Sequence, residues 1–197
     1  MNYLKSILLF FMCQSAVAQV PNNAEDISPL LISETIPNAT LLNPKGKKIQ
    51  LDAILKTKPT VLIFYRGGWC PFCNLQLSGL VKIEKEITDL GFQMIAISPD
   101  DYRNLDTTIE KNEVSYQVFS DPDAKLIQKI GIGFETPLMI KGYVATKKHI
   151  GKTSEVMPVP SVFVVDVKGK ILFEYINPNY KERINEDLLL AALKTLK

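Results

Sequence analysis

Apolar runs alternate along the chain with amphipathic segments, and this pattern predicts strands separated by helices. The runs at 59–65 and 92–98 are almost continuously apolar, so we expect both strands in the centre of a covered sheet. Between them, one apolar stripe predicts a helix; it consists of Leu77, Leu80, Ile83, Ile87 and Leu90. The helix is expected to stop at Gly91, because glycine readily adopts the left-handed backbone that ends many helices.

The rest of the chain continues this alternation. The further predicted elements are a hairpin (39–42 and 48–51), a helix (102–112), a short strand (117–119), a helix up to residue 130, an antiparallel strand pair (161–166 and 170–176) and a final helix (186–196). Strands joined through helices imply parallel crossovers, so we predict an α/β fold with a central mixed sheet flanked by helices. Residues 131–157 have scattered glycines and no clear period, and we expect an insertion or lid there.

Two cysteines at CxxC spacing stand where the 59–65 strand passes into the following helix. Pro71 suits the first helical position, so Cys70 is expected at the N-cap and Cys73 at the third helical position. Free backbone N–H groups and the helix dipole can lower a cysteine pKa there from about 8.5 to between about 3.5 and 7.5. The motif therefore predicts a redox-active pair with a nucleophilic thiolate.

Two other uses of the cysteines are less consistent with the sequence. A zinc site needs about four ligands, whereas the chain has three cysteines and one histidine, His149. We therefore predict no metal, and the sequence indicates no other cofactor. A structural disulfide across so short a loop would add little stability. His149 follows two lysines in the irregular 131–157 segment, and we expect it to be an exposed loop residue.

The first 18 residues follow the pattern of a secretory signal peptide. They contain one positive charge at Lys5, an apolar run at 7–12 and small residues before a cleavage site after Ala18. We therefore expect a secreted or periplasmic protein; the alternative is a signal anchor that stays in place. Removal of this segment, which contains Cys13, would leave an even pair of cysteines, as is usual for exported proteins.

Length and charge limit the remaining possibilities. Residues 19–37 are polar and aperiodic and predict an extended leader, and 38–197 has the size of one domain. The net charge is +2 and no basic stripe with interleaved aromatic residues is present, which argues against a nucleic-acid partner. No apolar segment after residue 18 is long enough to cross a membrane.

A longer stretch around the cysteines adds a resemblance to a known family. Phe64-Tyr65-Arg66-Gly67-Gly68-Trp69-Cys70-Pro71-Phe72-Cys73, with 120–122 and 157–166, resembles the peroxiredoxin-like branch of the alkyl hydroperoxide reductase/thiol-specific antioxidant family. The resemblance extends from about residue 28 to the C-terminus. It implies a thioredoxin-like fold of peroxiredoxin type, a hydroperoxide substrate and a thioredoxin-like electron donor. The cysteine that attacks peroxide in that family matches Cys73.

The chain also departs from the family pattern at three positions. Cys70 stands where the family has Thr, Arg66 where it has Pro, and Pro160 about where it has Arg. The absent Thr and Arg orient the peroxide, so their loss strengthens the alternative of a thioredoxin-like enzyme. Arg66 either supplies the absent charge or is a solvated turn residue. Trp69 is expected to pack around the thiols or contact a partner, and the Val159–Pro160 bond is predicted to be cis.

Three functions follow from these observations. The first is an exported antioxidant enzyme that reduces hydroperoxides through Cys70 and Cys73 and is recycled by a thioredoxin-like donor. The alternative is a thiol–disulfide oxidoreductase that acts on exported protein disulfides. The third is a binding module with a structural disulfide. For peroxide we expect Cys73 to attack and Cys70 to resolve the sulfenic acid; for protein disulfides we expect the reverse.

Overall fold

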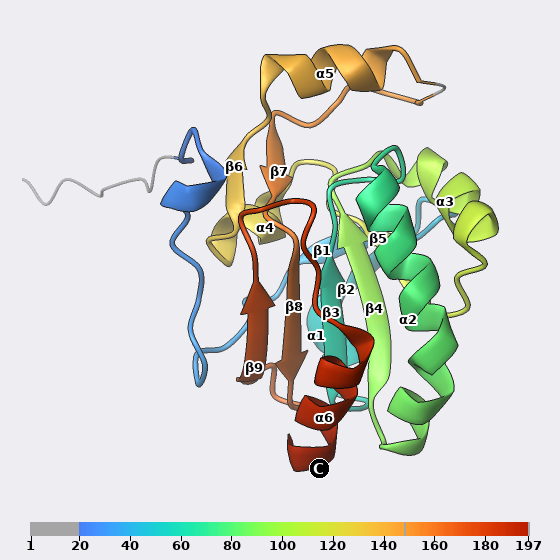
Figure 1. The fold of residues 1–197 in the computed structure, drawn as a ribbon, viewed down its shortest axis with the longest axis vertical. Coiled ribbons are helices and arrows are strands. Elements are labelled where there is room, and N and C mark those ends of the chain that lie inside the picture. Colours follow the sequence, from blue (N-terminus) through green and yellow to red (C-terminus); the bar gives the residue numbers. More distant parts are fainter. Residues whose placement is uncertain (1–19, 148, 197) are drawn as a thin grey trace, which may run out of the picture.

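The computed structural model describes residues 20–147 and 149–196 (Figure 1). The signal peptide predicted at residues 1–18 lies outside this range. In chain order the elements are η1 (Ala24–Asp26), β1 (Thr40–Leu42), β2 (Lys48–Gln50), α1 (Leu51–Leu55), β3 (Thr60–Phe64), α2 (Pro71–Asp89), β4 (Gln93–Ser98), η2 (Tyr102–Asn104), α3 (Leu105–Asn112), β5 (Gln117–Ser120), α4 (Lys125–Lys129), β6 (Gly133–Glu135), α5 (Leu138–Ala145), β7 (Val156–Pro158), β8 (Ser161–Val165), β9 (Ile171–Ile176) and α6 (Glu186–Leu196).

A mixed sheet forms the centre of the molecule. Seven strands of the described part pair in the order β2-β1-β5-β4-β3-β8-β9. β3, β4 and β5 run parallel to one another, whereas β8 lies antiparallel to β3. Parallel neighbours need crossover connections, which α2 and α3 supply. The predicted α/β fold with a central mixed sheet and flanking helices is confirmed. Within the described ranges, none of the helices has the length and apolar character that crossing a membrane requires.

β3 is the central strand because both of its faces are covered. Val61 and Ile63 pack in one core with Leu77 of α2, while Leu62 and Phe64 lie in a second core with residues of α1 and α4. α6 lies beside α2 on the first face, as Figure 1 shows. A strand buried on both faces needs side chains that are apolar at every position. The 59–65 run meets this requirement, and all five β3 residues are buried.

The turn between β3 and α2 places the cysteines. Cys70 is the N-cap of α2 and Pro71 is its first residue, as the sequence predicted. Gly67 has a φ of 146°, which side chains rarely tolerate. A Cβ atom there would lie 2.3 Å from Nε1 of Trp69 and 2.6 Å from Oδ1 of Asp100. Glycine at this position therefore allows the chain to turn tightly beneath the indole ring.

The 131–157 segment is more regular than its sequence indicated. β6 and β7 pair antiparallel, and α5 follows β6 at the end of the molecule shown uppermost in Figure 1. Leu138 and Met139 of α5 are 83% and 86% exposed, so this helix lacks the apolar stripe that predicts most helices. Its Tyr143 ring meets the Trp69 ring edge-on at 6.2 Å between centroids, which places α5 beside the cysteine turn.

Residues 20–37, which belong to the expected leader, contain the short helix η1, and their second half is packed against the body of the protein. Thr35 forms an isolated β-bridge with Lys170, and the N–H of Ile36 donates to the Gly169 carbonyl at 2.9 Å. The Ile36 side chain is buried in the core that contains α1. The polar composition of the segment did not indicate this packing. One apolar residue, Ile36, lying next to the turn before β9, is enough to produce it.

The predicted cis bond between Val159 and Pro160 is wrong, because the described residues contain no cis peptide bond. The N–H of Val159 donates to the Ile132 carbonyl at 2.8 Å, and its own carbonyl accepts the Ser161 hydroxyl at 2.8 Å. The backbone of Val159 is therefore already paired within the protein. Trans is also the strong default for bonds that precede proline.

We predict that Leu77→Ala lowers the free energy of unfolding by about 2–5 kcal/mol, because it leaves a cavity between α2 and the sheet. Leu77 is fully buried. Leu75→Ala is the matched control on the same helix, since Leu75 is 72% exposed and its loss should change stability by less than about 0.5 kcal/mol. Urea unfolding measures both, and equal losses would show that the α2 stripe does not form the core.

Candidate active site

The two cysteines form a buried dithiol at the start of α2. Both are free thiols in this structure, and they are 1% and 0% exposed for Cys70 and Cys73 respectively. The thiol of Cys73 donates a hydrogen bond to the sulfur of Cys70, and the Cys73 N–H is a second donor to it. One sulfur of the pair is therefore surrounded by donors, which favour its charged form.

These contacts separate the pKa values of the two thiols. The hydrogen bond from Cys73 lowers the pKa of Cys70 to about 6 against the opposing effect of burial, and the Cys73 N–H and the charges of Arg66 and Arg183 lower it further. Burial raises the pKa of Cys73 well above its ordinary value, and the hydrogen bond to Cys70 adds to this. The reduced pair therefore gives up one proton near pH 6 and retains the other.

Arg183 is a member of the site that the sequence analysis missed. Its Nη2 donates to Sγ of Cys73 at 3.4 Å, and its Nη1 donates to the carbonyls of Tyr180 and Glu182. It belongs to the loop between β9 and α6, 110 residues away from Cys73 in the sequence. No local motif marks this loop, so only the three-dimensional fold identifies the contact.

Arg66 lies on the other side of the dithiol and is buried, at 5% exposure. This excludes a solvated turn residue. Its guanidinium carbon lies 5.2 Å from the centroid of the Trp69 ring and 4.6 Å from that of the Tyr180 ring. Cation–π contacts of this kind hold a guanidinium in place without using its N–H groups. The positive charge of Arg66 therefore acts on the dithiol from a fixed position.

Pro160 lines a groove whose lining includes neither cysteine. Arg66 and Tyr180 line the same groove, which has a volume of about 350 Å³. The structure thus gathers four of the predicted residues, Cys70, Cys73, Arg66 and Trp69, around the start of α2. Pro160 is related to these four residues only because it lines the same groove as Arg66.

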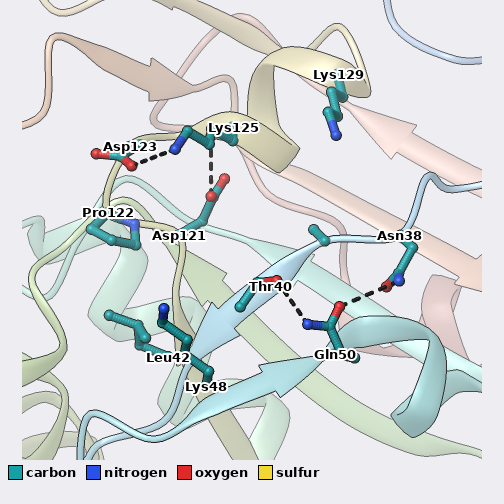
Figure 2. A pocket seen from close by; sticks show the side chains of 11 residues that line it. Asn38, Thr40, Leu42, Lys48, Gln50, Asp121, Pro122, Asp123, Lys125 and Lys129 are labelled. Carbon is teal, nitrogen blue, oxygen red and sulfur yellow. Dashed lines mark hydrogen bonds and ion pairs between the residues drawn. The ribbon is translucent and has the colours of Figure 1, made fainter.

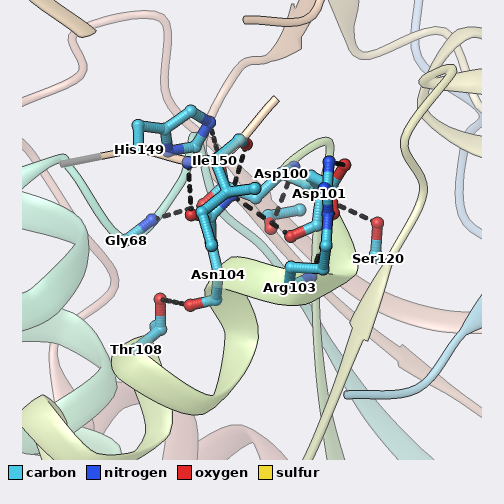
Figure 3. Close-up of polar contacts among 10 residues, drawn as sticks. Gly68, Asp100, Asp101, Arg103, Asn104, Thr108, Ser120, His149 and Ile150 are labelled. Carbon is cyan, nitrogen blue, oxygen red and sulfur yellow. Dashed lines mark hydrogen bonds and ion pairs between the residues drawn. The ribbon is translucent and has the colours of Figure 1, made fainter. Parts of the chain in front are cut away.

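The buried side chain of Asp100 contacts the turn that carries the cysteines. Figure 3 shows the Gly68 N–H and the imidazole of His149 converging on Asp100. The N–H donates to Oδ2 at 2.7 Å, and Nε2 of His149 lies 3.7 Å from Oδ1. The His149 side chain is 8% exposed, so the expected exposed loop residue is wrong. Asn104 fixes this loop by pairing with the N–H and carbonyl of Ile150 at 2.8 and 2.9 Å.

A second pocket lies away from the dithiol. It has a volume of about 710 Å³ and lies between the β1–β2 hairpin and the start of α4 (Figure 2). Asp121 at its edge accepts three backbone N–H groups of α4, and Lys125 is paired with Asp123. No sulfur lines it. In the described part of the chain, no cluster of three or more metal-ligating side chains is present.

We predict that the low pKa belongs to Cys70. In a Cys13→Ser background, thiolate absorbance should reveal one group with an apparent pKa of about 6. Cys73→Ala should move this pKa toward the ordinary value of 9.0, because the thiol donor is lost. Cys70→Ala should remove the transition near pH 6. A transition that persists in Cys70→Ala would assign the low pKa to Cys73.

We predict that Asp100 makes stability fall between about pH 4 and pH 7. Burial raises the pKa of Asp100 from its ordinary 3.8 to about 7, so the folded protein holds this proton more tightly than the unfolded chain. That contribution is complete below pH 3.8 and is lost as the pH rises through 7. Asp100→Asn should flatten the pH dependence of urea unfolding in this range. Asp101→Asn is the control, because the hydrogen bond from Arg103 lowers the pKa of Asp101 and moves its window to more acidic pH.

Comparison with known proteins relates this site to one family. A family model described as AhpC/TSA matches residues 32–173. A putative peroxiredoxin, bcp of Haemophilus influenzae, is 28% identical over 153 residues, which cover 76% of this chain and 98% of the relative. The thiol-disulfide oxidoreductase ResA of Bacillus cereus is 22% identical over 160 residues, which cover 81% and 78%. The structure of reduced Prx3 in complex with H2O2 from Vibrio vulnificus superposes with a TM-score of 0.70 at 20% identity, over 83% of this chain and 99% of that one.

These comparisons correct one expectation and confirm another. The expected secreted or periplasmic location is wrong, because it is contradicted by the similarity to Bcp-type peroxiredoxins. The thioredoxin fold of peroxiredoxin type is confirmed by the solved structures. The family match covers residues 32–173, which is well over half of the 197 residues, and the chain therefore belongs to the AhpC/TSA family.

Proposed function

We propose that this protein is a dithiol peroxidase that reduces hydroperoxides through Cys70 and Cys73. The observation that carries the proposal is the pair of free, buried thiols at the start of α2, where Arg183 donates to Cys73. In this pair the pKa of Cys70 is lowered and that of Cys73 is raised. A thiolate is the nucleophile that peroxide reduction needs, and a neighbouring thiol completes the reaction. Membership of the AhpC/TSA family and the bcp relative support the same chemistry.

The reaction balances with these two residues alone. The Cys70 thiolate attacks one peroxide oxygen, the O–O bond breaks, and the alcohol leaves after taking up a proton. The resulting sulfenic acid on Cys70 then condenses with the Cys73 thiol, which forms the disulfide and releases water. An external dithiol of thioredoxin type reduces the disulfide by exchange and restores both thiols.

This assignment reverses the roles that the family resemblance gave to the cysteines. Cys73 is fully buried, and its raised pKa keeps it protonated at neutral pH. Cys70 lies at the N-cap and carries the lowered pKa. The Arg183 contact with Cys73 suits the second step, because a nearby cation eases the loss of the Cys73 proton during condensation.

Reduction of protein disulfides is the second candidate. The thioredoxin-like Trp-Cys-x-x-Cys sequence and the similarity to ResA favour it. The trans Val159–Pro160 bond and the internally paired backbone of Val159 are unfavourable, because a substrate chain has no free strand edge there. We therefore place this activity second.

We predict that peroxide forms a sulfenic acid on Cys70. In a Cys13→Ser background, Cys73→Ser should accumulate a Cys70 adduct with dimedone, because no thiol remains to condense with it. Cys70→Ser should form little adduct, and the wild-type pair should form the disulfide instead. Intact-mass and peptide mass spectrometry measure all three. An adduct on Cys73 in Cys70→Ser, with none on Cys70 in Cys73→Ser, would restore the order that the family resemblance implies.

A direct comparison separates the two candidate functions. Oxidation of the reduced protein by a hydroperoxide and by a disulfide-containing peptide is followed under the same conditions in stopped flow. The proposed function requires the hydroperoxide to react faster per mole of oxidant. Faster reaction with the peptide disulfide would make the protein a thiol–disulfide oxidoreductase.

A further inference from the structure

The two arginines beside the dithiol differ in how their N–H groups are used. Arg183 donates to Cys73 and to two backbone carbonyls. The Arg66 guanidinium, in contrast, makes no hydrogen bond or ion pair with any described residue, and its Nε, like that of Arg183, is buried without a partner. A cation at 5% exposure with unused donors is costly for a folded protein. Such a group indicates an anionic ligand.

The groove beside Arg66 defines the shape of that ligand. It holds about 350 Å³, which is at the small end of the range for small-molecule sites. Its walls are mainly apolar and come from η1, β6, the start of α5 and the loop after β9; they include Ala24, Phe134, Pro137, Met139, Ile140 and Pro178. Arg66 is the only cation that lines it, and the exposed Glu25 is the only anion. The groove therefore offers a buried positive end and an apolar channel.

The geometry of Arg66 selects among anionic groups. Its ring contacts with Trp69 and Tyr180 hold the guanidinium plane, so the N–H edge is preorganised. A fixed guanidinium edge pairs best with two oxygens in one plane, as in a carboxylate. We propose that this groove is a binding site for a carboxylate with an apolar chain, with the carboxylate on Arg66 and the chain along Met139 and Ile140.

This site gives the proposed peroxidase a substrate class. When a thiolate attacks a peroxycarboxylic acid at its outer oxygen, the O–O bond breaks and a carboxylate leaves, while the sulfur becomes a sulfenic acid. The Arg66 guanidinium lies over the ring of Trp69, the residue that precedes Cys70, so we expect the leaving carboxylate to form near it. When an alkyl hydroperoxide reacts, the leaving group has a single oxygen atom, which can accept from only part of the N–H edge of Arg66. This inference rests on the proposed function for its chemistry, whereas the binding site itself does not.

Binding is tested without any turnover. Trp69 is the single tryptophan of the chain and lies beside Arg66, so its fluorescence reports on the groove. We expect saturable octanoate binding to the reduced full chain, with little binding of 1-octanol at the same concentrations. Arg66→Met should weaken octanoate by about tenfold or more, as expected for loss of charged hydrogen bonds. Arg103→Met, an exposed arginine paired with Asp101, should leave it unchanged.

A second variant keeps the test valid if Arg66→Met fails to fold. Met139→Glu puts a negative charge at the apolar wall of the groove, at a position that is 86% exposed, and should weaken octanoate several-fold. Leu188→Glu on α6, at 50% exposure, is the control. Equal binding of octanoate and 1-octanol, or octanoate affinity unchanged in Arg66→Met and Met139→Glu, would overturn the site.

Kinetics test the substrate class separately. Stopped-flow oxidation of the reduced wild type should be faster with peroxyoctanoic acid than with an alkyl hydroperoxide of the same length. Arg66→Lys, which keeps a charge but not the planar edge, should reduce this preference. Octanoate binding without any reaction with peroxides would refute the peroxidase and retain the site. Peroxide reactivity without octanoate binding would refute the site and retain the peroxidase.

Discussion

The interaction between the two thiols at the start of α2 is the one on which the rest of the site depends. The hydrogen bond from the Cys73 thiol to the Cys70 sulfur stabilises a thiolate in a place where burial would otherwise keep both groups neutral. That bond exists because the β3–α2 turn brings Cys70 to the N-cap and Cys73 one turn further into the helix. The turn in turn depends on the Gly68 N–H, which Asp100 holds from the end of β4. Two neighbouring parallel strands thus fix the position of the nucleophile.

The sequence predicted the parts of the fold that depend on local patterns. The β3 run, the α2 stripe and the Cys70–Pro71 helix start were confirmed because each is encoded by neighbouring residues. Arg183 and the burial of His149 were missed, since both result from contacts with residues far away in the sequence. α5 was missed because its apolar residues Leu138 and Met139 are exposed and do not form a buried apolar stripe along the helix. The cis bond at Pro160 was inferred by analogy, and the internal pairing of Val159 removes the reason for it.

Burial raises the pKa of each acidic group near the dithiol, but at Cys70 other interactions outweigh it. Burial lifts the pKa values of Cys73 and Asp100 and so favours their neutral forms. Cys70 is almost equally buried, yet its pKa falls because donors and two arginines surround its sulfur. The site can therefore contain one stable anion without a second one beside it. Because like charges repel strongly in a buried site, a neutral Cys73 is what allows the Cys70 thiolate to persist at neutral pH.

The three departures from the family pattern form one coherent change. With Thr replaced by Cys70, a second thiol stands at the start of the helix, one turn from Cys73. With the usual Arg position occupied by Pro160, positive charge must come from elsewhere, and Arg183 and Arg66 supply it from two different loops. Arg183 donates to Cys73 and to backbone carbonyls, whereas the Arg66 guanidinium makes no hydrogen bond with any described residue. The charge of Arg183 thus lies at the Cys73 sulfur, while that of Arg66 also lines the groove.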